Sequence, residues 1–344
     1  MIVTKNISIW KLLRWSGHHI VWLVGGSAII ALLYRFEILD FHIPWLPISV
    51  IGTAVAFYVG FKNNSAYDRM WEARKIWGAI INSSRAWGMY VDGFIGNLFT
   101  DKARKQEELH LIKERLIYRH IAWLYALRSQ LLVVTVWEHA NQGGLMGKTA
   151  KFYQEKFGIG LVADEVTKTE LKQYLPAAEH DRLVGNVNTA TQIINEQSRD
   201  LAQLRKEGLI DDFRHMEMSK ALYDFYVHQG KCERIKKFPL PRQYANISRY
   251  FIGIFILLLP FSMIPELMKL GEWGFWSSIL ITALIGWVYV MMEVIGDYSE
   301  NPFQGMANDI PMLSLCRVIE IDLREMLQEK ELPPSIQAKE GVLM

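Results

Sequence analysis

Four long apolar runs, two toward each end of the chain, constrain the fold more than any other feature of the sequence. The runs cover residues 20–34, 45–61, 250–265 and 273–292, and none of them contains a charged residue. About 20 helical residues are needed to cross the ~30 Å apolar layer of a bilayer. Because the runs are separate and each approaches this length, the sequence predicts four transmembrane helices.

The composition supports a membrane protein and excludes several other classes. Twelve tryptophans in 344 residues suit a protein with many side chains at a membrane interface. The formal net charge of +2 leaves no basic excess for binding nucleic acid. Cys232 and Cys316 are far apart and not part of a CxxC pair, so we expect reduced cytosolic thiols rather than disulfides or a zinc site.

Basic residues near the helix ends predict the orientation in the membrane. They precede the first and third apolar runs and follow the second, and so lie away from the short connections within the hairpins. The set is Lys5, Lys11, Arg14, Lys62, Arg69, Arg74, Lys75, Lys236, Lys237, Arg242 and Arg249. The positive-inside rule then places both termini and the long middle segment in the cytoplasm, in a multi-pass protein of the plasma membrane. The first run lacks a small-residue cleavage site, so we interpret it as a retained helix.

The predicted organisation is all-α. A transmembrane hairpin over 1–61, with helices at about 17–35 and 44–61, precedes a cytosolic helical domain over 62–249. A second hairpin over 250–296 and a cytosolic C-terminal segment over 297–344 follow. Within the middle domain, residue patterns favour helices at 67–87, 108–137, 163–174 and within 182–232, with a break at 141–147.

Motifs of enzymes and metal sites are missing from the sequence. It has no Gly-rich phosphate loop, HExxH or GxSxG. Only His18 and His19 adjoin, and neighbouring side chains on a helix diverge by about 100°, which favours two interfacial histidines over a metal pair. We therefore expect no catalytic residues, no metal site and no cofactor.

The second apolar run carries two distinct faces at four-residue spacing. Thr53, Phe57 and Phe61 share one face, and Gly52, Ala56 and Gly60 share the next. Small residues let helices approach closely in lipid, so in a ring of identical helices the small face would pack while the Phe face lined a central hole. The alternative is a plain packed helix whose aromatic side chains face lipid, and these residues alone do not decide between the two.

Several motifs resemble the bacterial bestrophin family. The segment FKNNSAYDRMWEARKIWG at 61–78 is similar to a family signature. CERI at 232–235 with PLP at 239–241, NPF at 301–303 with NDIP at 308–311, and IEIDL at 319–323 follow in the family's order. The resemblance therefore extends from the first apolar run to about residue 325.

The resemblance implies a homopentameric ion channel with four membrane helices and a large helical cytosolic part per subunit. It places Thr53, Phe57 and Phe61 in a narrow pore neck, and we expect Asn63 and Asn64 as polar contacts just inside it. Thr53 departs from the bulky apolar residues usual in the family and predicts a wider outer neck. The expected partners are identical subunits, membrane lipid and small inorganic ions.

The conducted ion is a separate question, because the family contains anion channels and bacterial relatives that prefer cations. The resemblance favours passive conduction of anions, chloride in the first place, and a monovalent-cation-selective channel of the same fold is the alternative. Eukaryotic members carry an acidic calcium-binding run after NPF. Here only Asp309 is acidic, so we expect no calcium site, and Asp309 should instead cap the helix that follows.

Two further sets of residues, three tryptophans and two carboxylates, follow the second and the fourth apolar run. Trp71, Trp77 and Trp87 are interpreted as interfacial anchors or subunit contacts. Glu293 and Asp297 are interpreted as solvated charges at the end of the last span, with an ion path as the alternative.

Two other classes of protein stay open: a membrane-anchored interaction protein and a secondary transporter, although the two hairpins do not resemble one another as transporter repeats would.

Overall fold

The structure, a computed structural model, describes residues 1–6, 8–156 and 171–344. In these residues it is helical apart from two isolated β-bridges, Ile2–Val342 and Lys339–Val342, so the expected all-α class is confirmed. The chain divides into two compact units. The membrane unit comprises Thr4–Arg69 and Pro239–Asn301, and the polar unit comprises Met1–Val3, Met70–Phe238 and Pro302–Met344.

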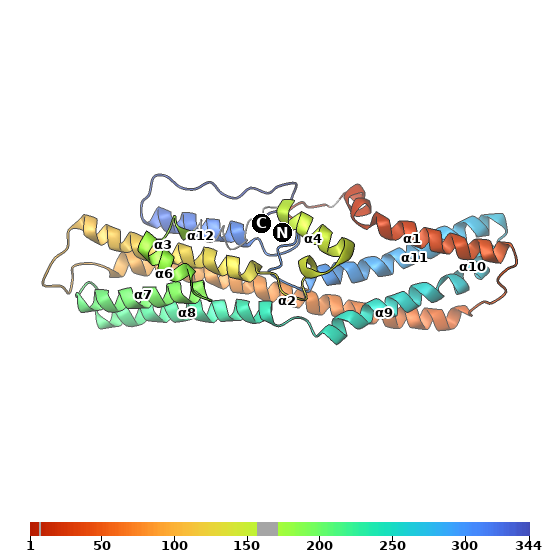
Figure 1. Cartoon of the computed structure of the whole chain (residues 1–344), viewed down its shortest axis with the longest axis horizontal. Coiled ribbons are helices and arrows are strands. Elements are labelled where there is room, and N and C mark those ends of the chain that lie inside the picture. Colours follow the sequence, from red (N-terminus) through yellow and green to blue (C-terminus); the bar gives the residue numbers. More distant parts are fainter. Residues whose placement is uncertain (7, 157–170) are drawn as a thin grey trace. The chain divides into compact units, whose positions relative to one another are not determined.

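The membrane unit contains the four predicted spans. Its helices are α1 (Ile9–Arg35), the first part of α2 (Trp45–Phe94), α9 (Arg242–Leu258), α10 (Pro260–Met268) and α11 (Glu272–Ser299) (Figure 1). Among the residues that the structure describes, four helical stretches are long and apolar enough to cross a membrane: Trp15–Arg35, Trp45–Phe94, Arg242–Met268 and Glu272–Ser299. The third span is divided at Pro260, which lacks the amide proton that a continuous helix would use.

Helix α2 is longer than the sequence expectation. It does not end near residue 61 but continues to Phe94, so its 50 residues contribute to both units. At 1.5 Å per residue this is about 75 Å of helix, more than twice the apolar thickness of a bilayer. The continuity has a simple cause, because no proline follows Pro47 within the helix. The helix expected at 67–87 is therefore a part of α2.

Close helix contacts in the membrane unit occur at glycines. A Cβ atom added to Gly286 of α11 would lie 2.8 Å from Leu23 of α1, and one added to Gly52 of α2 would lie 2.8 Å from Phe255 of α9. Tyr289 of α11 donates a hydrogen bond to the Gly52 carbonyl at 3.0 Å. Small residues permit this approach where lipid supplies no hydrophobic drive between helices.

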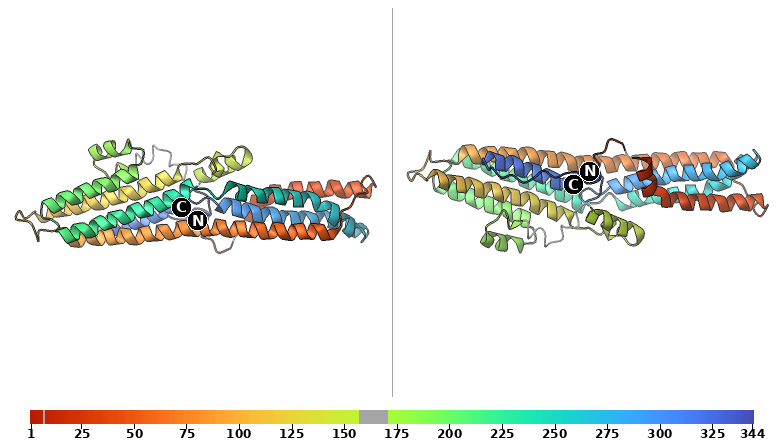
Figure 2. Two further views of the ribbon diagram at one scale, coloured as in Figure 1. Left: turned by 90° about the horizontal axis from the view of Figure 1, so that it is seen from below. Right: turned by 90° about the horizontal axis from the view of Figure 1, so that it is seen from above.

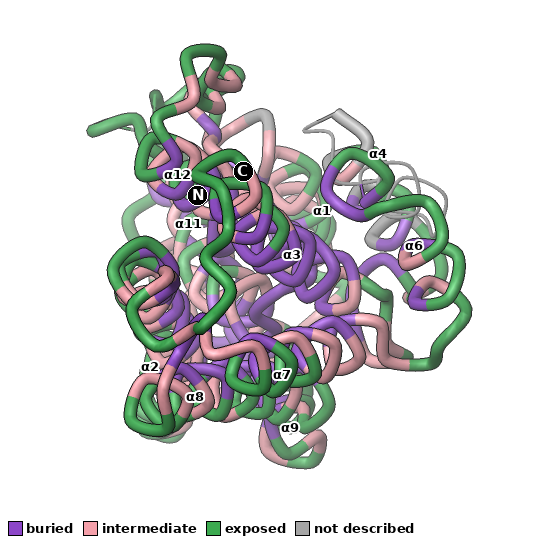
Figure 3. Tube along the Cα trace, turned by 90° about the vertical axis from the view of Figure 1, so that its left-hand side faces the viewer, coloured by how far each residue is buried: buried purple, intermediate pink, exposed green. Residues whose placement is uncertain are grey.

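The polar unit is built around α3 (Gln106–Leu132), which is buried along most of its length (Figure 3). The second part of α2 belongs to the same unit, together with α7 (Thr189–Lys206), α8 (Asp212–Lys237) and α12 (Met312–Met326) (Figure 2). Shorter elements are η1 (His139–Asn141), α4 (Gly144–Lys156) and α6 (Ala177–Val184). The core of this unit contains Trp87 and Trp123, whose rings both contact the ring of Phe225.

Several helix boundaries differ from the sequence expectation. Helix α3 ends at Leu132 rather than 137, because Val133 is extended (φ −57°, ψ 123°) and opens a β-branched segment that disfavours helix. The break expected at 141–147 is shorter, since α4 already begins at Gly144. Helices within 182–232 are present as the end of α6, α7 and most of α8. For the helix expected at 163–174, residues 163–170 lie outside the described residues, and 172–174 form a turn.

Two of the three tryptophans interpreted as membrane or subunit anchors are core residues. Trp77 and Trp87 are fully buried within the polar unit, whereas Trp71 is half exposed. Their indole rings fill the space between α2 and its neighbours, and their burial removes a large apolar surface from contact with water. The anchor interpretation is therefore wrong for Trp77 and Trp87.

Asp309 organises a turn rather than capping a helix. Helix α12 has Pro311 at its N-cap position and receives no side-chain cap there. The fully buried Asp309 carboxylate instead accepts hydrogen bonds from the amides of Phe303 (3.0 Å), Gly305 (2.7 Å) and Ile310 (2.7 Å). These bonds hold Phe303 in a left-handed conformation (φ 69°), which is costly for a residue with a side chain. Burial raises the pKa of Asp309, against the three amides, which lower it.

Candidate pore-lining face of helix α2

The predicted neck residues lie on an outward face of α2 in the membrane unit. Phe57 and Phe61 are 64% and 66% exposed in the single chain, and Thr53 is exposed as well. Their four-residue spacing places them along one stripe of the helix. Two phenyl rings left uncovered by their own chain must meet lipid, another subunit or the water of a pore.

The opposite face of the same helix is buried. Ile48, Val55, Val59 and Ala66 are almost fully enclosed, and the first three belong to the apolar core of the membrane unit. The helix thus has one face that packs against its own chain and one that does not. This division orients the Phe stripe outward.

The hydroxyl of Thr53 is occupied within the helix. Its Oγ1 donates to the Ser49 carbonyl at 2.8 Å. Only the oxygen lone pairs and the methyl group are therefore available on the outer surface, and Thr53 is smaller than the neighbouring phenylalanines.

The stripe of small residues does not have one uniform environment. Gly52 is buried against Phe255 and Tyr289 of the same chain, Ala56 is half-buried, and Gly60 is exposed with no atom within 4 Å of a Cβ built on it. Gly52 is therefore used for packing inside the subunit. A role of Ala56 and Gly60 in contacts between subunits stays a prediction.

The two asparagines that follow the neck point in different directions. Asn63 is half-buried and its Nδ2 donates to the Met292 carbonyl of α11 at 2.9 Å. Asn64 is exposed on the outward face. The structure thus brings Asn64 to the Phe stripe and places Asn63 against α11.

The charges near the end of the last span are buried. Glu293 forms an ion pair with Lys62 at 2.5 Å, with only 8% of its side chain exposed, and Asp297 lies 3.5 Å from Arg249 with 6% exposed. The interpretation of these carboxylates as solvated is therefore wrong, because basic side chains from α2 and α9 cover them. In the sequence, Lys62 was used only as a basic residue that follows the second run, and its burial was not predicted. Its spacing of three and seven residues from Val59 and Val55 places it on the same buried face of α2 and could have indicated this role.

Other polar groups give no sign of metal chemistry. Among the described residues, no group of three or more His, Cys, Asp or Glu side chains could hold a metal ion. The rings of His18 and His19 lie closer than expected, with centroids 3.9 Å apart, and His19 accepts a hydrogen bond from the Trp22 indole at 3.3 Å. The pair stays a feature of the α1 surface.

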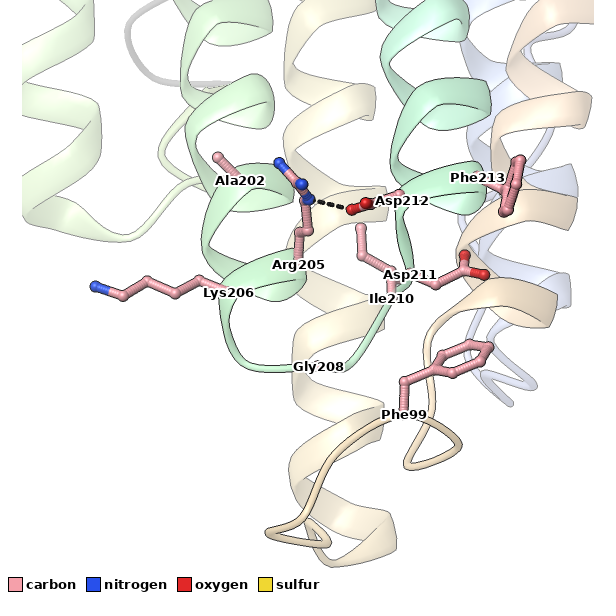
Figure 4. A pocket seen from close by; sticks show the side chains of 9 residues that line it. All are labelled: Phe99, Ala202, Arg205, Lys206, Gly208, Ile210, Asp211, Asp212 and Phe213. Atoms are coloured by element: carbon pink, nitrogen blue, oxygen red, sulfur yellow. Dashed lines mark hydrogen bonds and ion pairs between the residues drawn. The ribbon is translucent and has the colours of Figure 1, made fainter.

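A pocket in the polar unit lies where α7 ends and α8 begins (Figure 4). Its volume is about 720 Å³, and its lining includes Phe99, Lys206 and Phe213. Arg205 pairs with Asp212 across it. The pocket is open and its charges are partly paired, so we assign no ligand to it.

The fold and the face of α2 define a helical, multi-pass membrane protein with an aromatic stripe directed away from its own core. The chain matches the family described as Bacterial/Fungal Bestrophin protein over residues 15–325, and it belongs to that family. The crystal structure of a bacterial bestrophin homologue from Klebsiella pneumoniae superposes with a TM-score of 0.73 and 21% identity, covering 91% of this chain and 99% of that one.

Curated relatives carry consistent names. The voltage-dependent anion channel-forming protein YneE of Escherichia coli K12 is 25% identical over 335 residues, which is 96% of this chain and 94% of that protein. The voltage-dependent anion channel-forming protein mll4386 of Mesorhizobium japonicum is 29% identical over 317 residues, covering 90% of this chain and 84% of that protein. The membership of the bestrophin family that the sequence motifs predicted is thus confirmed.

Proposed function

We propose that this chain is the pore-forming subunit of a bestrophin-like channel that conducts anions, chloride in the first place, passively across the plasma membrane. Identical subunits would assemble as a pentamer with both termini in the cytoplasm. The observation that carries the proposal is the outward stripe of Thr53, Phe57 and Phe61. The names of the relatives as voltage-dependent anion channel-forming proteins support the choice of ion.

In a ring of subunits, each position of the stripe would become a ring of identical side chains. Phe57 and Phe61 would form an apolar constriction that opposes ion passage by excluding water. The edges of phenyl rings carry partial positive charge, so rings that turn their edges inward would favour anions. Such conduction is a passive process that uses no cofactor and no catalytic residue.

The outer edge of the neck would be wider at Thr53, whose side chain is smaller than phenylalanine and whose hydroxyl proton is already donated to Ser49. On the other side, Asn64 would offer an exposed amide to ions leaving the constriction. The neck would therefore be narrowest and driest between Phe57 and Phe61.

The reversal potential of purified protein in planar bilayers under a KCl gradient tests this function. We expect a potential close to the chloride equilibrium potential. A potential close to that of potassium would identify a monovalent-cation channel of the same fold. Purified, membrane-inserted protein that carries no current would contradict the channel and favour a membrane-anchored interaction protein.

A further inference from the structure

A single lysine of α2 is enclosed within the membrane unit. The side chain of Lys62 has no exposed surface, although it directly follows the outward Phe61. Its ammonium lies 2.5 Å from Oε1 of Glu293 on α11, and the hydroxyl of Ser248 on α9 donates to the same oxygen at 3.0 Å. One polar contact therefore joins three helices.

Residues of the apolar core flank this contact in the sequence of both helices. Val59 and Val290, each close in sequence to one partner, belong to the same apolar core. Within the described residues, the second oxygen of Glu293 is buried without a hydrogen-bond partner. A buried ion pair contributes little net stability compared with an apolar pair of the same size, and its best-supported role is to select one arrangement of helices.

Apolar packing alone selects weakly between rotations of a membrane helix. Lipid is as apolar as the side chains, so apart from the close contact of Gly52 with Phe255, turning α2 about its axis replaces one apolar contact by another. A step of one residue corresponds to about 100° of rotation. Such a turn would carry Lys62 away from Glu293 and leave both charges unpaired, and it would also break the bond from Asn63 to the Met292 carbonyl.

We propose that the Lys62–Glu293 pair, supported by Ser248, is a positioning pair that sets the rotation of α2 and so directs Phe57 and Phe61 outward. This inference rests on the proposed function, because the outward face is the face that would line the pore. Lys62 and Glu293 themselves do not touch the conducted ion.

Cysteine accessibility around the neck tests the pair. Ala56→Cys, Phe57→Cys and Tyr58→Cys are each made in the native background and treated with a charged, water-soluble thiol reagent during current recording. We expect position 57 to react fastest in that background. The double variant Lys62→Met with Glu293→Met leaves no unpaired charge, so it should fold and assemble, yet the reaction at position 57 should slow about tenfold while positions 56 and 58 gain reactivity.

Two further variants make the result decisive. The exchanged pair, Lys62→Glu with Glu293→Lys, should restore the native pattern. Lys269→Met removes the same charge from an exposed pair with Glu266 and should change nothing. An unchanged pattern in the double Met variant would overturn the positioning role and leave the channel intact. No reaction at position 57 in the native background would overturn the proposed pore face, and the inference with it.

Discussion

Among single residues, Phe57 is the one on which the proposed pore depends most. Its ring is 64% exposed on the outward stripe, and it lies one turn from Phe61. Replacing Phe57 by Ala should let water enter the neck and lower the barrier to ions. A barrier reduced by about 1 kcal/mol raises the rate of passage about fivefold. Single-channel currents of Phe57→Ala and wild-type protein, recorded at equal protein amounts, would measure the change.

Thr53→Ala is the matched control for this experiment. The Thr53 hydroxyl already donates to Ser49, so its removal should change the conductance much less. Equal conductance and selectivity of Phe57→Ala and wild type would place this side chain in lipid and remove α2 from the pore.

His120 is a second residue with a measurable consequence. It is completely buried in the polar unit, where its Nε2 lies 2.9 Å from Ser84 Oγ. Burial lowers the pKa of His120 from 6.5 to about 3. The unfolded chain binds the proton first, so stability is full above pH 6.5 and falls as the pH drops toward 3, by about 1.4 kcal/mol per pH unit.

Unfolding of the polar unit, followed by denaturant titration at pH 7, 6 and 5, would reveal this slope. His120→Gln should flatten it, since the titrating group is gone. His110→Gln, on the exposed side of the same helix α3, should leave the slope as it is. Identical slopes in His120→Gln and wild type would assign the acid sensitivity to other groups.

At the scale of elements, the glycines of α2 separate packing within a subunit from packing between subunits. A Cβ at Gly52 would meet the Phe255 ring at 2.8 Å, whereas a Cβ at Gly60 meets nothing in its own chain. We expect Gly52→Ala to destabilise the membrane unit by about 1–3 kcal/mol. Gly60→Ala should have little effect on the isolated subunit. Thermal unfolding in detergent compares the two, and equal melting temperatures would show that Phe255 moves aside freely.

Ala56 belongs to the contact between subunits in the proposed ring. It is half-buried and lies between Gly52 and Gly60. Ala56→Leu adds bulk where two helix backbones would approach, so the fraction of assembled protein should fall. Mass measurement of the detergent-solubilised protein would show a shift from five copies of the 39.9 kDa chain toward smaller species. Unaltered mass with normal conduction would mean that this face contacts lipid.

At the scale of the whole molecule, the proposed orientation can be tested in intact cells. Asp40 lies in the short connection after α1, and Gly143 lies between η1 and α4, and both are exposed. An impermeant thiol reagent should label Asp40→Cys but not Gly143→Cys. The native Cys232 and Cys316 are buried and should contribute little background. Labelling of Gly143→Cys alone would show that the orientation in the membrane is the reverse of the proposed one.

Features that depend on residues close together in the sequence could be predicted before the structure. The four spans could be predicted because hydropathy along a helix is a local property that needs no knowledge of packing partners. The family could be predicted because its motifs are short and occur in order. The shared stripe of Thr53, Phe57 and Phe61 follows from the helical period alone.

The side of each helix that is covered could not be predicted, because it depends on contacts between residues far apart in the sequence. Gly52 meets a ring about 200 positions away in sequence, Glu293 meets Lys62 across two helices, and Trp77 and Trp87 are enclosed by distant elements. Asp309 could be expected to cap α12, but two of the three amides that reach its carboxylate, those of Phe303 and Gly305, come from the turn before it. Burial and pairing are properties of the whole packed chain, and a residue pattern contains no information on which distant partner fills a given contact.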